Sequence, residues 1–239
     1  MNTRKQTITA ESLRQLPGFS RFTIPQLDEM AKNLTVKSIK RNEIIFAQGD
    51  PADLVYVLLS GIARLSLVNE EGRQVLITLL APGEVLGIGA FVFDKRHPIR
   101  CDAFSQCTVG MLKPETFIVA STGLSSGAFF SFMEVTMGRV WKMLLHCTRG
   151  IGLTLRKRLA LELLELAASF GTSHTLGTIL ALRPRHEDLA NAIGASRQRV
   201  SECLADFARE RAVIREPGRF IIVPAKLRAI VERESGEKP

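Results

Sequence analysis

The most chemically distinctive part of the sequence is a run of polar side chains that begins at Ser196. Its members can donate or accept hydrogen bonds at the edges of nucleic-acid bases: Ser196, Arg197, Gln198, Arg199, Ser201 and Glu202. Further along, Arg215 and Arg219 flank a Pro-Gly pair, where guanidinium groups suit contacts with phosphate. These residue types predict that the segment reads double-stranded DNA.

The residues from 185 to 200 indicate which elements position these side chains. Ala190 is small, as the crossing of two closely packed helices requires, and Gly194 can adopt the left-handed conformation that ends a first helix. Ser196 is a suitable N-cap for a second helix. The apolar face of that helix is formed by Val200, Cys203, Leu204 and Phe207. This spacing predicts a helix-turn-helix, followed over residues 212–223 by a two-stranded wing. A solvated charged helix and an unrelated hairpin are the structural alternative.

A heptad pattern precedes this region, within a helical stretch from about residue 126 to 170. Apolar residues alternate at spacings of three and four: Phe130, Met133, Met137, Val140, Leu144, Cys147 and Ile151. Such a stripe predicts a seam between two long helices, and hence a homodimer; a long core helix lying on the preceding domain is the alternative. Gly150 and Gly152 interrupt the pattern and predict a hinge. Cys147 on the seam is compatible with a packed thiol or with a redox role.

The first half of the chain has a different pattern. From about Ile24 to Leu112, short apolar runs alternate with glycine-containing turns, which favours an all-β sandwich or barrel. The net charge of +8 and the pI of about 9.7 are compatible with a polyanionic partner. The sequence contains no phosphate-binding loop, no G-x-S-x-G nucleophile motif and no cysteine or histidine spacing typical of a metal site, so neither an enzyme nor a metal is expected. With no apolar run near the roughly 18 residues of a membrane span and no signal peptide, we expect a cytoplasmic protein without a membrane partner.

Over about residues 19–228, the chain resembles the family of the cyclic-AMP receptor protein and the fumarate–nitrate reduction regulator. The resemblance is carried by the glycines and segments Gly49, Gly61, Gly72, Gly83, Pro82-Gly83-Glu84-Val85-Leu86-Gly87 and Ile193-Gly194-Ala195-Ser196-Arg197. It implies an α+β chain with a cyclic-nucleotide-binding-type β roll (a jelly roll) over residues 1–125, a dimerisation helix and hinge over 126–152, and a winged helix-turn-helix over 153–239. It also implies a palindromic operator and, for an activator, RNA polymerase as a partner.

The resemblance fails where the family binds cyclic AMP. Family members that bind it have Gly-Glu-Leu, whose glutamate holds the ribose, and Arg-Ser-Ala, whose arginine holds the phosphate. Here Ile88 replaces the glutamate, and His97-Pro98-Ile99 replaces the second motif. The polar residues that contact adenine are replaced by Met143 and Leu144. Cyclic AMP is therefore not the expected effector, and the candidate effector pocket consists of Gly87, Ile88, Phe91, His97, Arg100, Met143 and Leu144.

Other effectors of the family can be weighed by the same residues. An iron–sulfur cluster is not expected because no cysteine precedes Cys101. Haem would need an axial ligand, for which His97, His146 and Cys101 are candidates. A small apolar ligand, or no ligand at all, is favoured by the apolar character of Phe91, Val92, Phe93, Met143 and Leu144, which would serve equally well as core residues.

Overall fold

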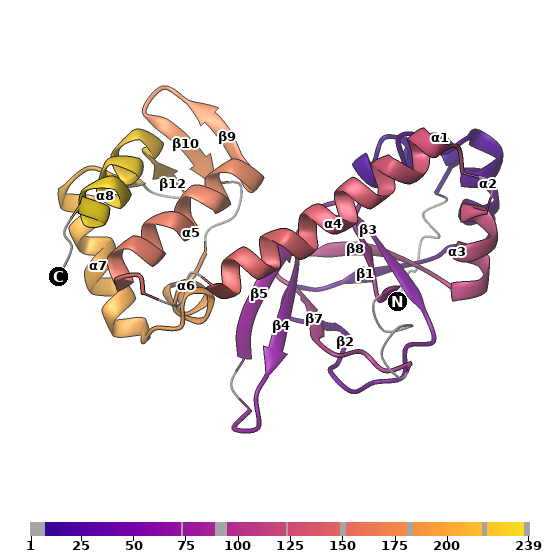
Figure 1. The fold of residues 1–239 in the computed structure, drawn as a ribbon, viewed down its shortest axis with the longest axis horizontal. Helices are drawn as coiled ribbons and strands as arrows, with labels where there is room; N and C mark the ends of the chain where they lie inside the picture. Colours follow the sequence, from indigo (N-terminus) through magenta and orange to yellow (C-terminus); the bar gives the residue numbers. More distant parts are fainter. Residues whose placement is uncertain are drawn as a thin grey trace. The chain divides into compact units, whose positions relative to one another are not determined.

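The computed structural model describes residues 8–72, 74–88, 95–122, 124–148, 152–180, 184–216 and 219–236. The chain divides into two compact units, Met1–Leu145 and His146–Pro239. The first unit contains the β domain and most of the long helix, and the second contains the helix-turn-helix (Figure 1). The predicted α+β fold is thus confirmed.

The β domain is built from two antiparallel four-stranded sheets, ordered β1-β8-β3-β6 and β2-β7-β4-β5. Their strands are β1 Thr35–Ile39, β2 Ile44–Phe46, β3 Val55–Ser60, β4 Ala63–Val68, β5 Gln74–Leu80, β6 Val85–Leu86, β7 Arg100–Ala103 and β8 Cys107–Leu112. One core lies among strands of both sheets and includes Phe46, Leu65 and Cys101. The predicted β roll follows from this pattern, since each sheet turns one apolar face inward.

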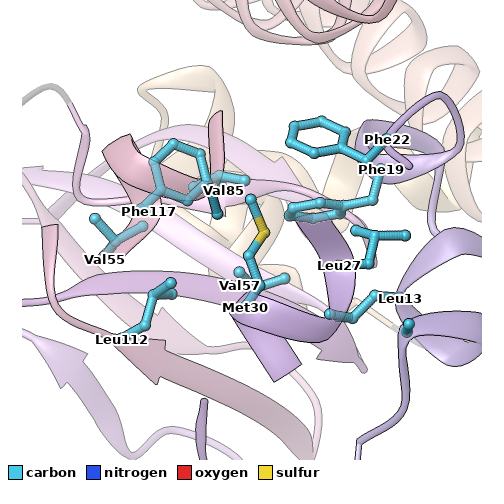
Figure 2. Packing of buried hydrophobic residues seen from close by; sticks show 12 residues of the cluster. Leu13, Phe19, Phe22, Leu27, Met30, Val55, Val57, Val85, Leu112 and Phe117 are labelled. Atoms are coloured by element: carbon cyan, nitrogen blue, oxygen red, sulfur yellow. The ribbon is translucent and has the colours of Figure 1, made fainter. Parts of the chain in front are cut away.

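A second core lies where short helices cover the sheet that contains β3 and β8 (Figure 2). These elements are α1 Ala10–Arg14, the 3-10 helix η1 Pro17–Phe19, α2 Ile24–Asn33 and α3 Pro114–Ser121. Figure 2 shows Phe19 and Leu27 from these helices on one side of Met30 and strand residues Val55 and Leu112 on the other.

The expectation of strands from Ile24 onward is wrong for its first ten residues, which form α2. A capping box begins this helix, because the side chain of Gln26 accepts a hydrogen bond of 3.0 Å from the backbone nitrogen of Thr23. Pro25 in the first turn has no N–H to lose there. Leu27 and Met30, three residues apart, then lie buried on one helical face.

The long helix α4 spans Ser126–Thr148, and its first 20 residues belong to the first unit. The helix carries apolar side chains on its solvent side: Phe129, Phe130, Met137, Val140, Trp141, Leu144 and Leu145 are all exposed. An amphipathic surface helix normally turns its apolar stripe toward its own core. In α4 a large part of that stripe is left uncovered within one chain.

The second unit consists of α5 Leu155–Phe170, β9 Gly171–His174, β10 Gly177–Leu180, α6 His186–Ile193, α7 Arg197–Arg209, β11 Val213–Glu216, β12 Arg219–Ile222 and α8 Pro224–Gly236. The predicted wing strands, β11 and β12, continue into a four-stranded sheet of order β11-β12-β10-β9. Strands β9 and β10 are not predicted from the sequence, because each has only four residues and β9 contains no apolar side chain.

Candidate DNA-binding surface and effector pocket

The turn between α6 and α7 has the geometry that the sequence predicts. Gly194 lies in the left-handed region at φ 61° and ψ 49°, and the backbone nitrogen of Ala195 then donates to the carbonyl of Ala190 at 2.9 Å. From α5, a guanidinium nitrogen of Arg158 donates to the carbonyl of Ile193 at 2.6 Å, which satisfies the last turn of α6. The turn is therefore closed by backbone geometry and braced by a neighbouring helix.

Helix α7 is capped by Ser196, whose hydroxyl accepts a hydrogen bond of 3.3 Å from the backbone nitrogen of Arg199. One face of the helix is buried by Val200, Cys203, Leu204 and Phe207. The other face exposes Arg197, Gln198, Arg199 and Glu202. A helix fixed by its apolar face thus presents a row of donors and acceptors to solvent, as a recognition helix must.

A chain of hydrogen bonds joins this helix to the wing. Arg215 on β11 lies 3.2 Å from Nε2 of His186, and Nδ1 of His186 lies 2.6 Å from the hydroxyl of Ser201. Because a guanidinium can only donate, Nε2 is the acceptor and Nδ1 carries the proton that is donated to Ser201. The hydroxyl of Ser201 in turn donates to the carbonyl of Arg197 at 2.9 Å. His186 is thereby placed to hold a wing arginine and the recognition helix in one arrangement.

Two further candidate residues of this surface, Gln198 and Glu202, are paired with each other. The side-chain amide of Gln198 donates to the carboxylate of Glu202 at 3.0 Å. This hydrogen bond joins two of the side chains that are predicted to read DNA. Arg219 is the first residue of β12, and its side chain lies outside the described part of the structure.

We expect His186→Phe to weaken operator binding about fivefold, because two hydrogen bonds of about 0.5–1.5 kcal/mol each would be lost and Arg215 would no longer be held. The measurement is a fluorescence-anisotropy titration of an operator fragment with His186→Phe, Arg215→Ala and the double variant. If His186 acts by positioning Arg215, the double variant should lose less binding free energy than the two single variants together. The difference should be about 0.5 kcal/mol or more. Strictly additive losses would contradict this role.

In the first unit, a pocket of about 300 Å³ lies between the β domain and α4. Its lining is almost entirely apolar: Phe46, Leu65, Val85, Leu86, Gly87, Ile88, His97, Pro98, Ile99, Thr136, Met137, Arg139, Val140 and Met143. Of the predicted effector-pocket residues, Gly87, Ile88, His97 and Met143 are brought together here. Arg100 and Leu144 are not among the lining residues, and Phe91 lies outside the described residues.

His97 is buried in this pocket, with 2% of its surface exposed. Its ring stacks on Phe46 with centroids 4.0 Å apart, and its backbone nitrogen donates to the carbonyl of Asp50 at 2.9 Å. Gly87 lies beside the ring with φ 87°, and a Cβ there would come within 3.0 Å of the carbonyl oxygen of Leu54. Burial lowers the pKa of His97, and the carboxylates of Asp50 and Asp53 oppose this only partly, so the imidazole is neutral at pH 7.

The charges near the pocket are matched by partners. Arg139 on α4 donates to the carbonyl of Val85 at 2.9 Å, and its Nε lies 3.5 Å from a carboxylate oxygen of Glu84. Arg100 lies outside the lining and, together with Arg64, faces the fully buried carboxylate of Asp102. Arg139 is not predicted from the sequence, because its partner Glu84 lies 55 positions earlier in the chain.

Residues 36–120 match the model of the cyclic nucleotide-binding domain, and residues 157–230 match that of the Crp-like helix-turn-helix domain. The chain is also 30% identical over 192 residues to the global nitrogen regulator of Nostoc sp., which covers 75% of this chain and 80% of that protein. The chain belongs to the CRP/FNR family of transcription regulators. Members of the CRP/FNR family are not enzymes, so the prediction that this chain is none is confirmed.

Two further CRP/FNR proteins illustrate the range of the family. The CRP-like cAMP-activated global transcriptional regulator of Mycobacterium tuberculosis is 28% identical over 203 residues, which cover 81% of this chain and 86% of that protein. The structure of FixK2 from Bradyrhizobium japonicum has a TM-score of 0.70 at 21% identity, and the match covers 82% of this chain and 96% of that chain. At that identity the likeness to FixK2 shows the fold alone.

The predicted dimer seam of this CRP/FNR chain lies on α4. Phe130, Met137, Val140 and Leu144 are exposed there, and Met133 is half-buried. The side chain of Cys147 and the whole of Ile151 lie outside the described residues.

Cys101, which was one candidate haem ligand, is a free thiol in the core of the β domain, where burial raises its pKa and keeps it protonated. No helix in the described ranges is long and apolar enough to cross a bilayer.

Proposed function

We propose that this DNA-binding regulator acts as a homodimer that binds a palindromic operator and is controlled through the pocket by an effector other than cyclic AMP. The observation that carries the dimer is the exposed apolar stripe of α4, which one chain leaves uncovered. Two copies paired along that stripe would bury it and would present two α7 helices to two half-sites. The protein would then work in three parts, with residues 1–125 sensing, 126–152 dimerising and 153–239 binding DNA.

In this arrangement α7 enters the major groove. By resemblance to the family, Arg197, Gln198 and Glu202 lie at its base-reading positions. Arg199, Arg215 and Arg219 suit phosphate contacts, which add affinity without reading sequence. RNA polymerase becomes a further partner if the regulator activates transcription. As a chromosome-binding regulator, the protein would act in the cytoplasm.

The proposal is tested by selecting binding sites from a random DNA library with the purified full chain, followed by gel shifts on the recovered site. We expect a palindrome whose half-sites share one guanine with the sites of the cyclic-AMP receptor protein and differ at neighbouring positions. Arg197 keeps the arginine that this protein has at the first reading position. Gln198 and Glu202 replace a glutamate and an arginine at the other two. Recovery of unrelated sequences, or of a single half-site without symmetry, would argue against a dimeric reader.

We predict that cyclic AMP does not bind to this pocket in the micromolar range. Its ribose hydroxyl would meet the aliphatic side chain of Ile88, and its phosphate would have to compete with Glu84 for Arg139. Isothermal titration calorimetry should show no saturable heat up to about 1 mM nucleotide. The binding free energy of cyclic AMP would then be weaker than about −4 kcal/mol. The cAMP-activated relative from Mycobacterium tuberculosis is the positive control. Saturable micromolar binding, or cyclic-AMP-dependent DNA binding, would show that the pocket does take the nucleotide.

A further inference from the structure

Two residues that line the pocket each carry a buried nitrogen with no hydrogen-bond partner among the described residues, His97 and Arg139, and of these Nε of Arg139 lies 3.5 Å from a carboxylate oxygen of Glu84. Within the described part of the chain, Nε2 of His97 is buried and has no hydrogen-bond partner. Buried polar groups are normally paired, and an unpaired one destabilises the state that buries it. The ring that carries this atom is held on its face by Phe46 and along its backbone by Asp50, so it is not free to turn to solvent. A ligand that supplies the missing partner would therefore gain from a group already fixed in place.

The charge distribution argues against an anionic ligand. The one cationic side chain that lines the pocket, within the described ranges, is Arg139, and this guanidinium already contacts the carbonyl of Val85 and the carboxylate of Glu84. A carboxylate or phosphate placed beside Arg139 would come close to the negative charge of Glu84. It would also exchange its hydration for mostly aliphatic and aromatic neighbours, which is costly for a charge.

The size of the pocket and the chemistry of His97 restrict the class of ligand further. A volume of about 300 Å³ lies at the lower end for ligand sites, which suits a molecule of one or two rings. A haem, with four pyrrole rings and two carboxylates, is both larger and doubly charged. A neutral imidazole offers Nε2 either as donor or as acceptor, depending on its tautomer. A hydroxyl can pair with both forms, whereas a ketone pairs with only one.

We propose that the effector of this pocket is a compact, uncharged, mainly apolar molecule with one hydroxyl group that pairs with Nε2 of His97. This proposal rests on the proposed control of the regulator through the pocket. The apolar body would fill the space bounded by Leu65, Ile88, Ile99 and Met143. Specificity would come from the single hydroxyl, because a site that buries a polar group discriminates strongly against an analogue that leaves it unpaired.

Three probes of one shape test this: 2-naphthol, naphthalene and 2-naphthoate. The full chain is labelled with ¹³C at its methionine methyl groups, and binding is followed by NMR. Met137 and Met143 line the pocket and should shift, whereas Met30 is not among the lining residues and should shift much less. We expect 2-naphthol to bind about tenfold more tightly than naphthalene, and 2-naphthoate to bind most weakly.

The variant His97→Phe should abolish the tenfold preference and leave naphthalene binding nearly unchanged, because phenylalanine keeps the stack on Phe46. His174→Phe, in the β9–β10 hairpin of the second unit, is the matched control and should keep the preference. If His97→Phe fails to fold, the comparison of the three probes on the wild type still decides the proposal.

Equal binding of naphthol and naphthalene would mean that Nε2 is satisfied by water alone, and this would overturn the proposal. Tightest binding of 2-naphthoate would do the same, by assigning an anion to Arg139. A haem absorption band in the purified protein would overturn it in favour of His97 as an iron ligand. A gel shift with the selected operator, run in parallel without any probe, separates these results from a failure of the proposed DNA-binding function.

Discussion

The double variant Phe130→Glu/Leu144→Glu should be a monomer that binds a palindromic operator about 10²–10⁴-fold more weakly than the wild type, because two half-sites would no longer be engaged together. Both side chains lie on the uncovered stripe of α4, with 69% and 53% of their surfaces exposed. Glutamate at either position would be solvated in a single chain. In a dimer paired along α4, it would lose that hydration and face its own negative charge across the symmetry axis.

Neither residue lines the pocket, so the variant separates dimerisation from effector binding. Lys32→Glu is the matched control, because it lowers the net charge by two, as the double variant does, at an exposed site on α2. The measurements are light scattering for mass and anisotropy for DNA affinity, with circular dichroism to show that the fold is kept. A double variant that scatters as a dimer with unchanged DNA affinity would place the dimer contact elsewhere.

The second large effect is expected at the start of the recognition helix. Arg197→Ala should cost about 1–3 kcal/mol of operator affinity, which is roughly 5- to 150-fold, and should relax the preference at one base position. The guanidinium is exposed on the first turn of α7, where it can pair bidentately with O6 and N7 of guanine. Because its helix is fixed by four buried side chains and by the Ser196 cap, removing it should leave the unit folded.

Arg199→Ala provides the comparison on the same turn with the same loss of charge. If Arg199 meets phosphate, its loss should weaken all sequences alike and make the salt dependence of log K shallower by about one. Both variants are measured by anisotropy against the selected operator, single-base variants of it and random DNA, across a series of salt concentrations. Should Arg199→Ala change base preference while Arg197→Ala does not, the assignment of the two side chains would be reversed.

The helix-turn-helix could be predicted from sequence because its requirements are local. A small residue at Ala190, a left-handed residue at Gly194 and a cap at Ser196 all lie within seven positions, and each is needed for a stated steric reason. Helix α2 had a local signal too, in Thr23, Pro25 and Gln26, but the apolar residues that follow also suit a strand. Strand β10 had none for its pairing with β12, which joins residues more than 40 positions apart, and β9 pairs with β10 alone.

The chemistry of the pocket depends on contacts between residues that are far apart in the sequence. The family resemblance placed four pocket residues near one another: Gly87, Ile88, His97 and Met143. Nothing in the sequence indicated that His97 stacks on Phe46, 51 positions earlier, or that Arg139 pairs with Glu84. Tertiary packing decides whether a buried charge or ring nitrogen has a hydrogen-bond partner. The spacing of residues along one strand or helix does not predict this.

Met137 and Val140 each line the pocket and are also about half exposed on the stripe of α4. Should two chains pair along that stripe, the same two side chains would contact the effector on one side and the second chain on the other. Occupancy of the pocket and association of the chains would then be thermodynamically linked, and each would change the affinity of the other by the same factor. The apparent effector affinity would consequently vary with total protein concentration across the range in which the dimer forms, so the abundance of the regulator would itself set its sensitivity to the signal.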